Sequence, residues 1–238
     1  MEIFYYLHRG VREYRMRTRP LVQLSLLTAF TTVATMSLSI YIPATRGYFN
    51  VGEIMVYISA IVGGPYIGGF AGGVGSMLAD VFLQYYIYAP ATLMIKGAEG
   101  FITGFIARRY GKKTKMLSIL LLLSMGAISL YLSLGDFMIL VLLGNEVRIP
   151  NLLWLILSAV LIVLSTIIVI LKPETSRNVL AMSLGGGIMV IGYFVYESIL
   201  FGFGAAFVEV PINIAQVAFG IIGALPIARV LERAVTQA

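Results

Sequence analysis

The residues of this chain that could do chemistry are a few charged side chains inside long apolar stretches. They are Glu53, Asp80, Lys96, Glu99, Glu197 and Glu209, and the amides of Asn213 and Gln216 follow the last of them. An ionisable group in an apolar stretch is costly to bury, so it faces protein or water and usually marks a functional site. One interpretation is that Lys96 simply neutralises Asp80 or Glu99. The acids outnumber Lys96 and Arg46, however, so we expect a solvated cavity that binds a small polar molecule.

Several other kinds of chemistry are excluded because the residues they need are missing. The sequence contains no Cys, which rules out disulfides, thiolate nucleophiles and sulfur-ligated metals. Its single His is His8, in an Arg-rich segment, so histidine metal sites and Ser-His-Asp hydrolysis lack a residue to use. The sequence has no Walker-type phosphate loop, so any ATP hydrolysis is expected on a partner. We therefore expect no enzyme activity, no metal and no cofactor.

The elements that must position these side chains are membrane-spanning helices. Of the 238 residues, 59% are apolar or aromatic and only 12% are charged, whereas about a quarter of a soluble domain is charged. The mean hydropathy is +0.94. A soluble domain of this length could not bury so much apolar surface, but a lipid bilayer removes the need to bury it. The chain is predicted to be an all-α, polytopic membrane helix bundle forming a single membrane domain over residues 1–238.

Apolar runs predict eight transmembrane helices, since a helix needs about 20 mostly apolar residues to cross the hydrocarbon layer. The runs are 21–42, 52–63, 66–84, 92–109, 116–135, 151–171, 179–202 and 210–230. The second run is short and ends at Gly63-Gly64-Pro65, which predicts two helices and a turn over residues 52–84. The alternative is a single re-entrant unit.

The basic residues predict how the chain is oriented in the cell membrane. With the N-terminus inside, every Lys and Arg except Arg46, Lys96 and Arg148 lies on the cytoplasmic side, where basic residues accumulate. Both termini are therefore predicted to be cytoplasmic. Because the basic residues flank apolar runs, the net charge of +6 does not indicate nucleic-acid binding. Residues 1–18 lack the apolar centre of a cleavable signal peptide and are expected to form a cytoplasmic or interfacial segment.

Helical periodicity places small and polar residues on shared faces of the spans. The third span carries Gly69, Gly73, Ser76 and Asp80 on one face, the fourth Thr92, Lys96, Gly100 and Thr103, the seventh Gly186, Tyr193 and Glu197, and the eighth Glu209, Asn213, Gln216 and Gly220. Glycines allow helices to approach closely, and the polar residues lie nearer the outer ends. The pattern predicts a bundle closed on the cytoplasmic side and open outside as a polar cup. Tyr85, Tyr86, Tyr88 and Trp154 are interpreted as interfacial anchors.

Six motifs occur in a characteristic order along the chain. They are Gly47–Glu53, Gly63–Pro65, Gly72–Asp80, Tyr88–Gly100, Gly192–Glu197 and Glu209–Gln216. Together they resemble the substrate-binding S components of energy-coupling-factor (ECF) vitamin transporters, in the style of the riboflavin and hydroxymethylpyrimidine branch. The resemblance implies a six-helix core, here residues 19–111 and 178–234, and makes residues 112–177 an inserted two-helix transmembrane hairpin. The outer loop of this hairpin either covers the cup or is a peripheral addition.

The resemblance also implies a function and partners. An S component binds a water-soluble vitamin or precursor, here of riboflavin, pyridoxine or hydroxymethylpyrimidine type, on the extracellular side. It then docks on a transmembrane coupling subunit driven by two ATPase subunits. Many members carry an Ala-xxx-Ala docking motif on the first helix. The nearest equivalents here are the small residues Ser25, Ala29, Thr31, Thr35 and Ser39.

The predicted binding site combines an outer loop with the polar helix faces. Loop 43–51, which includes Arg46, is expected to close over the ligand while aromatic side chains stack on its ring. The predicted site residues are Tyr48, Phe49, Asn50, Glu53, Asp80, Lys96, Glu99, Tyr193, Glu197, Glu209, Asn213 and Gln216. The surplus of acids favours a neutral or cationic ligand. The competing hypotheses are a stand-alone proton- or sodium-coupled transporter, for which inverted repeats are expected, and an intramembrane enzyme, for which a nucleophile and base are lacking.

Overall fold

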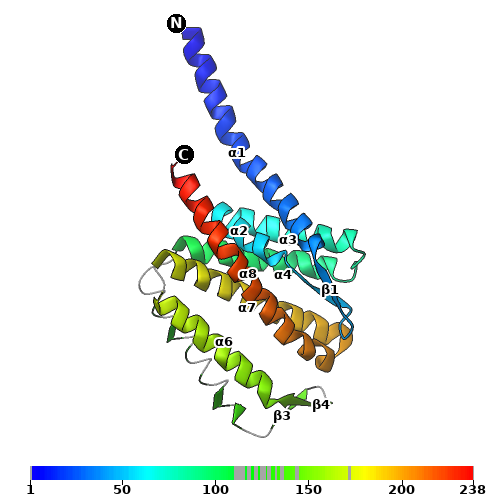
Figure 1. The fold of residues 1–238 in the computed structure, drawn as a ribbon. Helices are drawn as coiled ribbons and strands as arrows, with labels where there is room; N and C mark the ends of the chain where they lie inside the picture. Colours follow the sequence, from blue (N-terminus) through cyan, green and yellow to red (C-terminus); the bar gives the residue numbers. More distant parts are fainter. Residues whose placement is uncertain are drawn as a thin grey trace.

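Helices make up most of the described chain. The computed structural model describes residues 2–109, 137–142, 145–170 and 173–237, together with single residues between 116 and 134. The helices are α1 (Glu2–Ser37), α2 (Glu53–Gly63), α3 (Pro65–Phe82), α4 (Ala89–Arg109), α6 (Asn151–Ile170), α7 (Pro173–Phe201) and α8 (Phe203–Gln237). Two antiparallel hairpins pair β1 (Ser39–Ile42) with β2 (Gly47–Asn50) and β3 (Phe137–Leu142) with β4 (Asn145–Pro150). Figure 1 shows α1 continuing well beyond the rest of the bundle towards the N-terminus.

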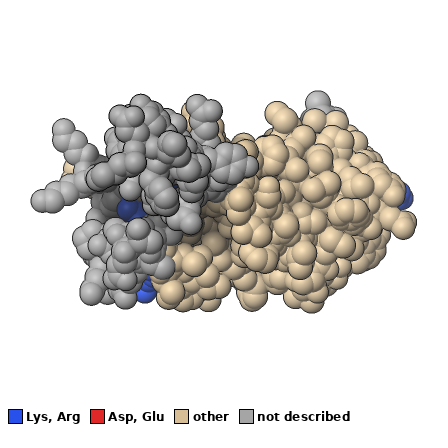
Figure 2. Space-filling view, turned by 90° about the horizontal axis from the view of Figure 1, so that it is seen from above, with Lys and Arg blue, Asp and Glu red and all other residues tan. Residues whose placement is uncertain are grey.

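The surface of this bundle is that of a membrane protein. Within the described residues, the stretches 20–37, 175–201 and 203–231 are each long and apolar enough to cross a bilayer unaided. Large apolar side chains such as Val33, Ile199 and Ile222 are more than 60% exposed, which suits lipid and not water. On the face shown in Figure 2 no acidic side chain is visible among the described residues, and only a few basic ones are. The predicted all-α polytopic membrane bundle is confirmed.

Residues 52–84 form two helices with a sharp turn between them, as predicted. The turn is at Gly64, whose φ of 81° lies in the left-handed region that favours glycine. Pro65 follows as the first residue of α3, where its missing N–H is not needed. Helix α2 has only 11 residues and is therefore about 16 Å long. Its short length is tolerated because α1, α3, α4 and α8 pack around it.

Helices α3 and α4 run antiparallel with their backbones in contact. A Cβ added to Gly100 would lie 2.2 Å from the carbonyl oxygen of Gly68, and a Cβ on Gly73 would lie 2.6 Å from that of Leu93. Further along, a Cβ on Gly104 would lie 2.6 Å from the carbonyl carbon of Gly64. No other residue type fits at these positions without moving a backbone. These glycines thus allow the close helix approach that the sequence predicts.

The predicted first span, 21–42, is wrong at its end. Helix α1 stops at Ser37, and residues 39–42 form strand β1 instead. The apolar residues Ile40, Tyr41 and Ile42 prolong the hydropathy of the helix, but β-branched and aromatic residues also suit a strand. Pro43 then disfavours a helical conformation at the residue before it. Hydropathy alone therefore could not separate the end of the helix from the strand.

Helices α7 and α8 complete the wall of the bundle opposite α1 and α3. Helix α7 packs closely on α4, because a Cβ on Gly185 would lie 2.9 Å from the carbonyl oxygen of Glu99. Helix α8 packs on α7 and α2. The apolar core between them is built from fully buried side chains that include Tyr57, Leu180, Met182 and Met189.

Residues 112–177 are described only in part. The predicted span 116–135 lies largely outside the described residues, whereas 151–171 corresponds to α6, which contacts α7. The loop between these two spans contains the β3–β4 hairpin, which the sequence did not indicate. The assignment of this segment as an inserted transmembrane hairpin on a six-helix core stays a prediction.

Candidate functional site

A small cavity lies among the helices beneath the β1–β2 hairpin. We refer to this hairpin, residues 39–50, as the lid. The cavity is lined by Thr35, Gly47, Tyr48, Asn50, Ser76, Asp80, Tyr88, Thr92, Lys96, Tyr193, Glu197, Glu209, Asn213 and Gln216. Nine of the twelve predicted site residues are in this set. The free volume is about 30 Å³, and one water molecule needs about 10–15 Å³ on this measure. The cavity therefore has room for about two waters while the lid is in place.

Hydrogen bonds to side chains of α3 and α8 hold the lid on the cavity. The Tyr48 hydroxyl donates to Asp80 Oδ1 at 2.6 Å, and the Asn50 N–H donates to Gln216 Oε1 at 3.0 Å. The Thr45 hydroxyl donates to a carboxylate oxygen of Glu209. Burial, reinforced by the Asp80 carboxylate, raises the pKa of Tyr48 far above its usual value. The Tyr48 hydroxyl therefore keeps its proton and remains a donor to Asp80.

The predicted role of Phe49 in the site is not supported by its position. Strand residues alternate between two faces, and Tyr48 and Asn50 line the cavity while Phe49 does not. The Phe49 ring instead meets the Phe219 ring of α8 edge to face, with centroids 6.3 Å apart. Phe49 thus anchors the lid on α8. The sequence showed three polar or aromatic residues in a row but not which of them would face inward.

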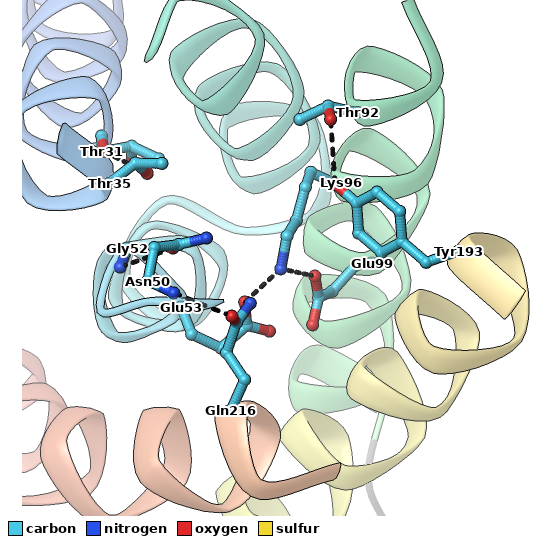
Figure 3. A network of polar contacts seen from close by, with 10 residues as sticks. All are labelled: Thr31, Thr35, Asn50, Gly52, Glu53, Thr92, Lys96, Glu99, Tyr193 and Gln216. Atoms are coloured by element: carbon cyan, nitrogen blue, oxygen red, sulfur yellow. Dashed lines mark hydrogen bonds and ion pairs between the residues drawn. The ribbon is translucent and has the colours of Figure 1, made fainter. Parts of the chain in front are cut away.

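A buried ion triad forms the floor of the cavity. The Lys96 ammonium donates to Glu53 Oε2 and, at 3.0 Å, to Glu99 Oε2. The Gln216 side-chain amide lies 3.4 Å from the same Glu53 oxygen. Figure 3 shows Lys96 descending from α4 between the two carboxylates, with Gln216 approaching from α8. All three charged side chains are buried, and the second oxygens of Glu53 and Glu99 have no hydrogen-bond partner.

The triad bears on three expectations. Of the two partners expected for Lys96, Glu99 is one and Asp80 is not, Glu53 is a further partner, and Lys96 still lines the cavity. Glu53 and Glu99 support Lys96 from outside the cavity lining and do not themselves line it. Glu99 also lies deeper than expected. Helix α4 begins at Ala89, so Glu99 is about 15 Å along it, near the middle of its 21 residues.

Tyr88, which directly precedes α4, and Tyr193 of α7 form an aromatic wall of the cavity. The hydroxyls of Thr92 and Tyr193 share a hydrogen bond of 2.9 Å. The Tyr88 ring lies beside the Tyr193 ring with centroids 6.3 Å apart. The Tyr88 hydroxyl donates to the carbonyl oxygen of Thr45 at 2.8 Å and lies 3.4 Å from Glu197 Oε1. This wall therefore links the lid to an acid of α7.

Sequence reasoning missed several lining residues. Tyr88 was interpreted as an interfacial anchor, but it is only 4% exposed and lines the cavity. Tyr88 directly precedes the first residue of α4, a position typical of interfacial anchors. It is buried because the lid folds over it. Ser76 and Thr92 could have been found, because they share helix faces with Asp80 and Lys96. Gly47 begins the first of the six motifs, but nothing in its residue type placed it at the cavity.

The five residues expected at a docking surface divide into two groups. Thr31 and Thr35 are buried against α3 and Gly52, and Thr35 lines the cavity. Their hydroxyls donate to carbonyl oxygens one turn earlier in α1. Ser25, Ala29 and Ser39 are exposed. Any contact with a partner on this helix would therefore use the face that carries Ser25 and Ala29.

Comparison with known proteins identifies similar sequences. A model of the family described as "ECF-type riboflavin transporter, S component" matches residues 15–171. A Pyrococcus woesei protein described as "Uncharacterized protein in gap 3'region" is 51% identical over 84 residues. That alignment covers 34% of this chain and 56% of the relative, so the chain matches just over half of the relative's length.

Proposed function

This chain belongs to the family of ECF-type riboflavin transporter S components, and from that premise we propose that it is the substrate-capture component of an ECF importer. It binds a water-soluble vitamin or precursor, of riboflavin, pyridoxine or hydroxymethylpyrimidine type. The observation that carries the proposal is the cavity itself. Aromatic rings and a few buried polar groups converge under a lid, which is the usual composition of a tight small-molecule site.

The cavity is proposed to open on the extracellular side of the cell membrane. It lies where α3 and α7 end and where α4 and α8 begin. Arg108 at the other end of α4 donates to the carbonyl oxygen of Gly63, and Arg229 near the end of α8 donates to the Thr175 hydroxyl. Basic residues mark the cytoplasmic side. Both chain termini would accordingly be cytoplasmic.

Binding requires the lid to lift, because the free volume of about 30 Å³ is too small for a heterocycle. Lifting breaks the hydrogen bonds from Tyr48 to Asp80 and from Asn50 to Gln216. The ligand ring would then lie against the tyrosines of the wall and lid, where aromatic stacking contributes about 0.5–1.5 kcal/mol per pair. The freed carboxylate and amide groups would bind its polar atoms.

Delivery to the cytoplasm is proposed to depend on a separate ECF module. Its transmembrane coupling subunit would dock on the exposed face of α1, where Ser25 and Ala29 are one turn apart and permit close helix contact. Two ATPase subunits would supply the energy, since the sequence has no phosphate loop of its own.

Binding and transport assays on the purified full-length protein test this function. In nanodiscs, riboflavin, pyridoxine, thiamine, hydroxymethylpyrimidine, pantothenate and biotin would each be titrated and followed by thermal shift and calorimetry. We expect submicromolar binding of one of them without an ion gradient. Liposomes holding only this protein should take up none of that ligand. Uptake driven by a proton or sodium gradient in those liposomes would overturn the proposal in favour of a secondary transporter.

A further inference from the structure

The cavity is lined by more acidic than basic side chains. Three of the side chains that line it are carboxylates, Asp80 from α3, Glu197 from α7 and Glu209 from α8. The lining residue of opposite charge, Lys96, is already shared by Glu53 and Glu99. The triad therefore has no positive charge to spare for the three carboxylates above it. Arg46, at the turn of the lid, is exposed and is not among the lining residues.

The hydrogen-bond donors around the cavity are largely occupied within the protein. The Tyr48 hydroxyl donates to Asp80, and the Tyr88 hydroxyl donates to Thr45. The hydroxyls of Thr92 and Tyr193 bond to each other. A ligand that offers acceptors would have to displace one of these bonds or use the remaining donors, which are the third N–H of Lys96, the Ser76 hydroxyl and the side-chain amides of Asn50 and Asn213.

Two carboxylate oxygens, in contrast, are buried without a partner. Asp80 Oδ2 and Glu197 Oε2 have no hydrogen-bond partner, although the two residues are only 2% and 1% exposed. They lie on α3 and α7, and both residues line the cavity. An unsatisfied buried carboxylate is unfavourable, and an N–H donor that carries positive charge relieves it best. Two acceptors without a partner thus belong to residues of different helices that line the same cavity.

We propose that the substrate of this site is a cationic, nitrogen-rich heterocycle, bound through N–H groups to Asp80 and Glu197. Its positive charge is a protonated amine or an amidine-like group, and its ring lies against Tyr88 and Tyr193, where aromatic faces also attract cations. The inference rests on the proposed function and narrows its substrate class. It places neutral flavins and anionic vitamins below cations of similar size.

Chemically matched ligands test this inference on the full-length protein in nanodiscs. Pyridoxamine and pyridoxine share a ring and differ by an aminomethyl group in place of a hydroxymethyl group, and thiamine supplies a second cation. Riboflavin is the neutral probe and pantothenate the anionic probe. We expect a cation to bind at least about 10-fold more tightly than its neutral or anionic counterparts, the factor that one charged hydrogen bond supplies.

Two variants assign that preference to the named residues. Glu197→Gln and Asp80→Asn should each reduce the cation preference about 10-fold, with neutral ligands much less affected. Glu174→Gln, which removes an acid from the first turn of the same helix as Glu197, is the matched control and should leave the preference unchanged. Where a variant does not fold, the ranking of probes on the unaltered protein decides.

The outcomes separate this inference from the function on which it rests. Tight binding of riboflavin or pantothenate with weaker binding of both cations would overturn the inference and leave the capture function standing. A cation preference that survives both substitutions would also overturn it. Absence of binding by every probe would count against the capture function and the inference together.

Discussion

Replacing Lys96 with methionine tests whether its ammonium stabilises the two buried acids beside it. Methionine keeps most of the length of the lysine side chain and removes its charge. Glu53 and Glu99 would then face each other without a cation, both fully buried. We expect Lys96→Met to be strongly destabilising, because an uncompensated charge cannot be hydrated at this depth.

The size of the effect follows from the geometry. At the 3.0 Å between Lys96 Nζ and Glu99 Oε2, Coulomb's law with an effective dielectric constant of about 20 gives an attraction of about 5.5 kcal/mol. Removing one partner of a buried pair typically lowers the unfolding free energy by about 3–5 kcal/mol. Glu99→Gln, in contrast, leaves no unpaired charge. It leaves one carboxylate with one ammonium and removes the repulsion between the acids, so its cost should stay within about 1 kcal/mol.

Equilibrium unfolding in mixed detergent micelles, followed by circular dichroism, measures these differences. Arg109→Met removes an exposed positive charge from the same helix and should cost less than about 1 kcal/mol. Lys96→Met in a Glu53→Gln and Glu99→Gln background should recover most of the lost stability, since the interaction is pairwise. A loss of less than about 1 kcal/mol for Lys96→Met, or an equal loss in the background without acids, would refute the reasoning.

Two further substitutions probe the helix packing and the lid. Gly100→Ala brings a methyl group to 2.2 Å from the Gly68 carbonyl oxygen and should lower the unfolding free energy by about 1–3 kcal/mol. Gly187→Ala, with no atom within 4 Å of the added carbon, should be neutral or slightly stabilising. Tyr88→Phe removes the hydroxyl that holds Thr45, so amide hydrogen exchange in residues 39–50 should accelerate about 2- to 10-fold.

Each of these predictions would be contradicted by a particular result. Equal stability of the Gly100 and Gly187 variants in thermal unfolding would mean that α3 and α4 do not touch through their backbones. Tyr86→Phe is the control for the lid, because Tyr86 is 63% exposed. The lid hydrogen bond carries no stabilisation if exchange is the same in the Tyr86 and Tyr88 variants.

The sequence predicted the helix faces better than the loop that covers them. Asp80, Lys96, Glu197 and Gln216 converge as expected, because periodicity and span direction decide which faces meet. Glu53 and Glu99 were expected to bind ligand and instead hold Lys96. The sequence alone indicates that these charged residues are buried. How deep each one lies in the bundle depends on where its helix starts, which the sequence does not fix. Helix α4 starts three residues before the predicted span.

The lid could not be predicted from composition, for a physical reason. A strand of four residues that continues an apolar helix has no period long enough to identify. Its pairing decides that Phe49 points to α8 and that Tyr88 becomes buried. Thr31 and Thr35 were expected on an outer surface because small residues permit close approach. Small residues do not specify which element packs against them. Here α3 and the start of α2 pack against Thr31 and Thr35.

The backbone contact between α3 and α4 restricts where a bound solute can leave. It extends from Gly73 and Leu93 to Gly64 and Gly104, over most of the first half of α3. A heterocycle cannot thread between two main chains that touch. The route between α3 and α4 is therefore closed to a bound ligand, which must enter and leave past other elements such as the lid.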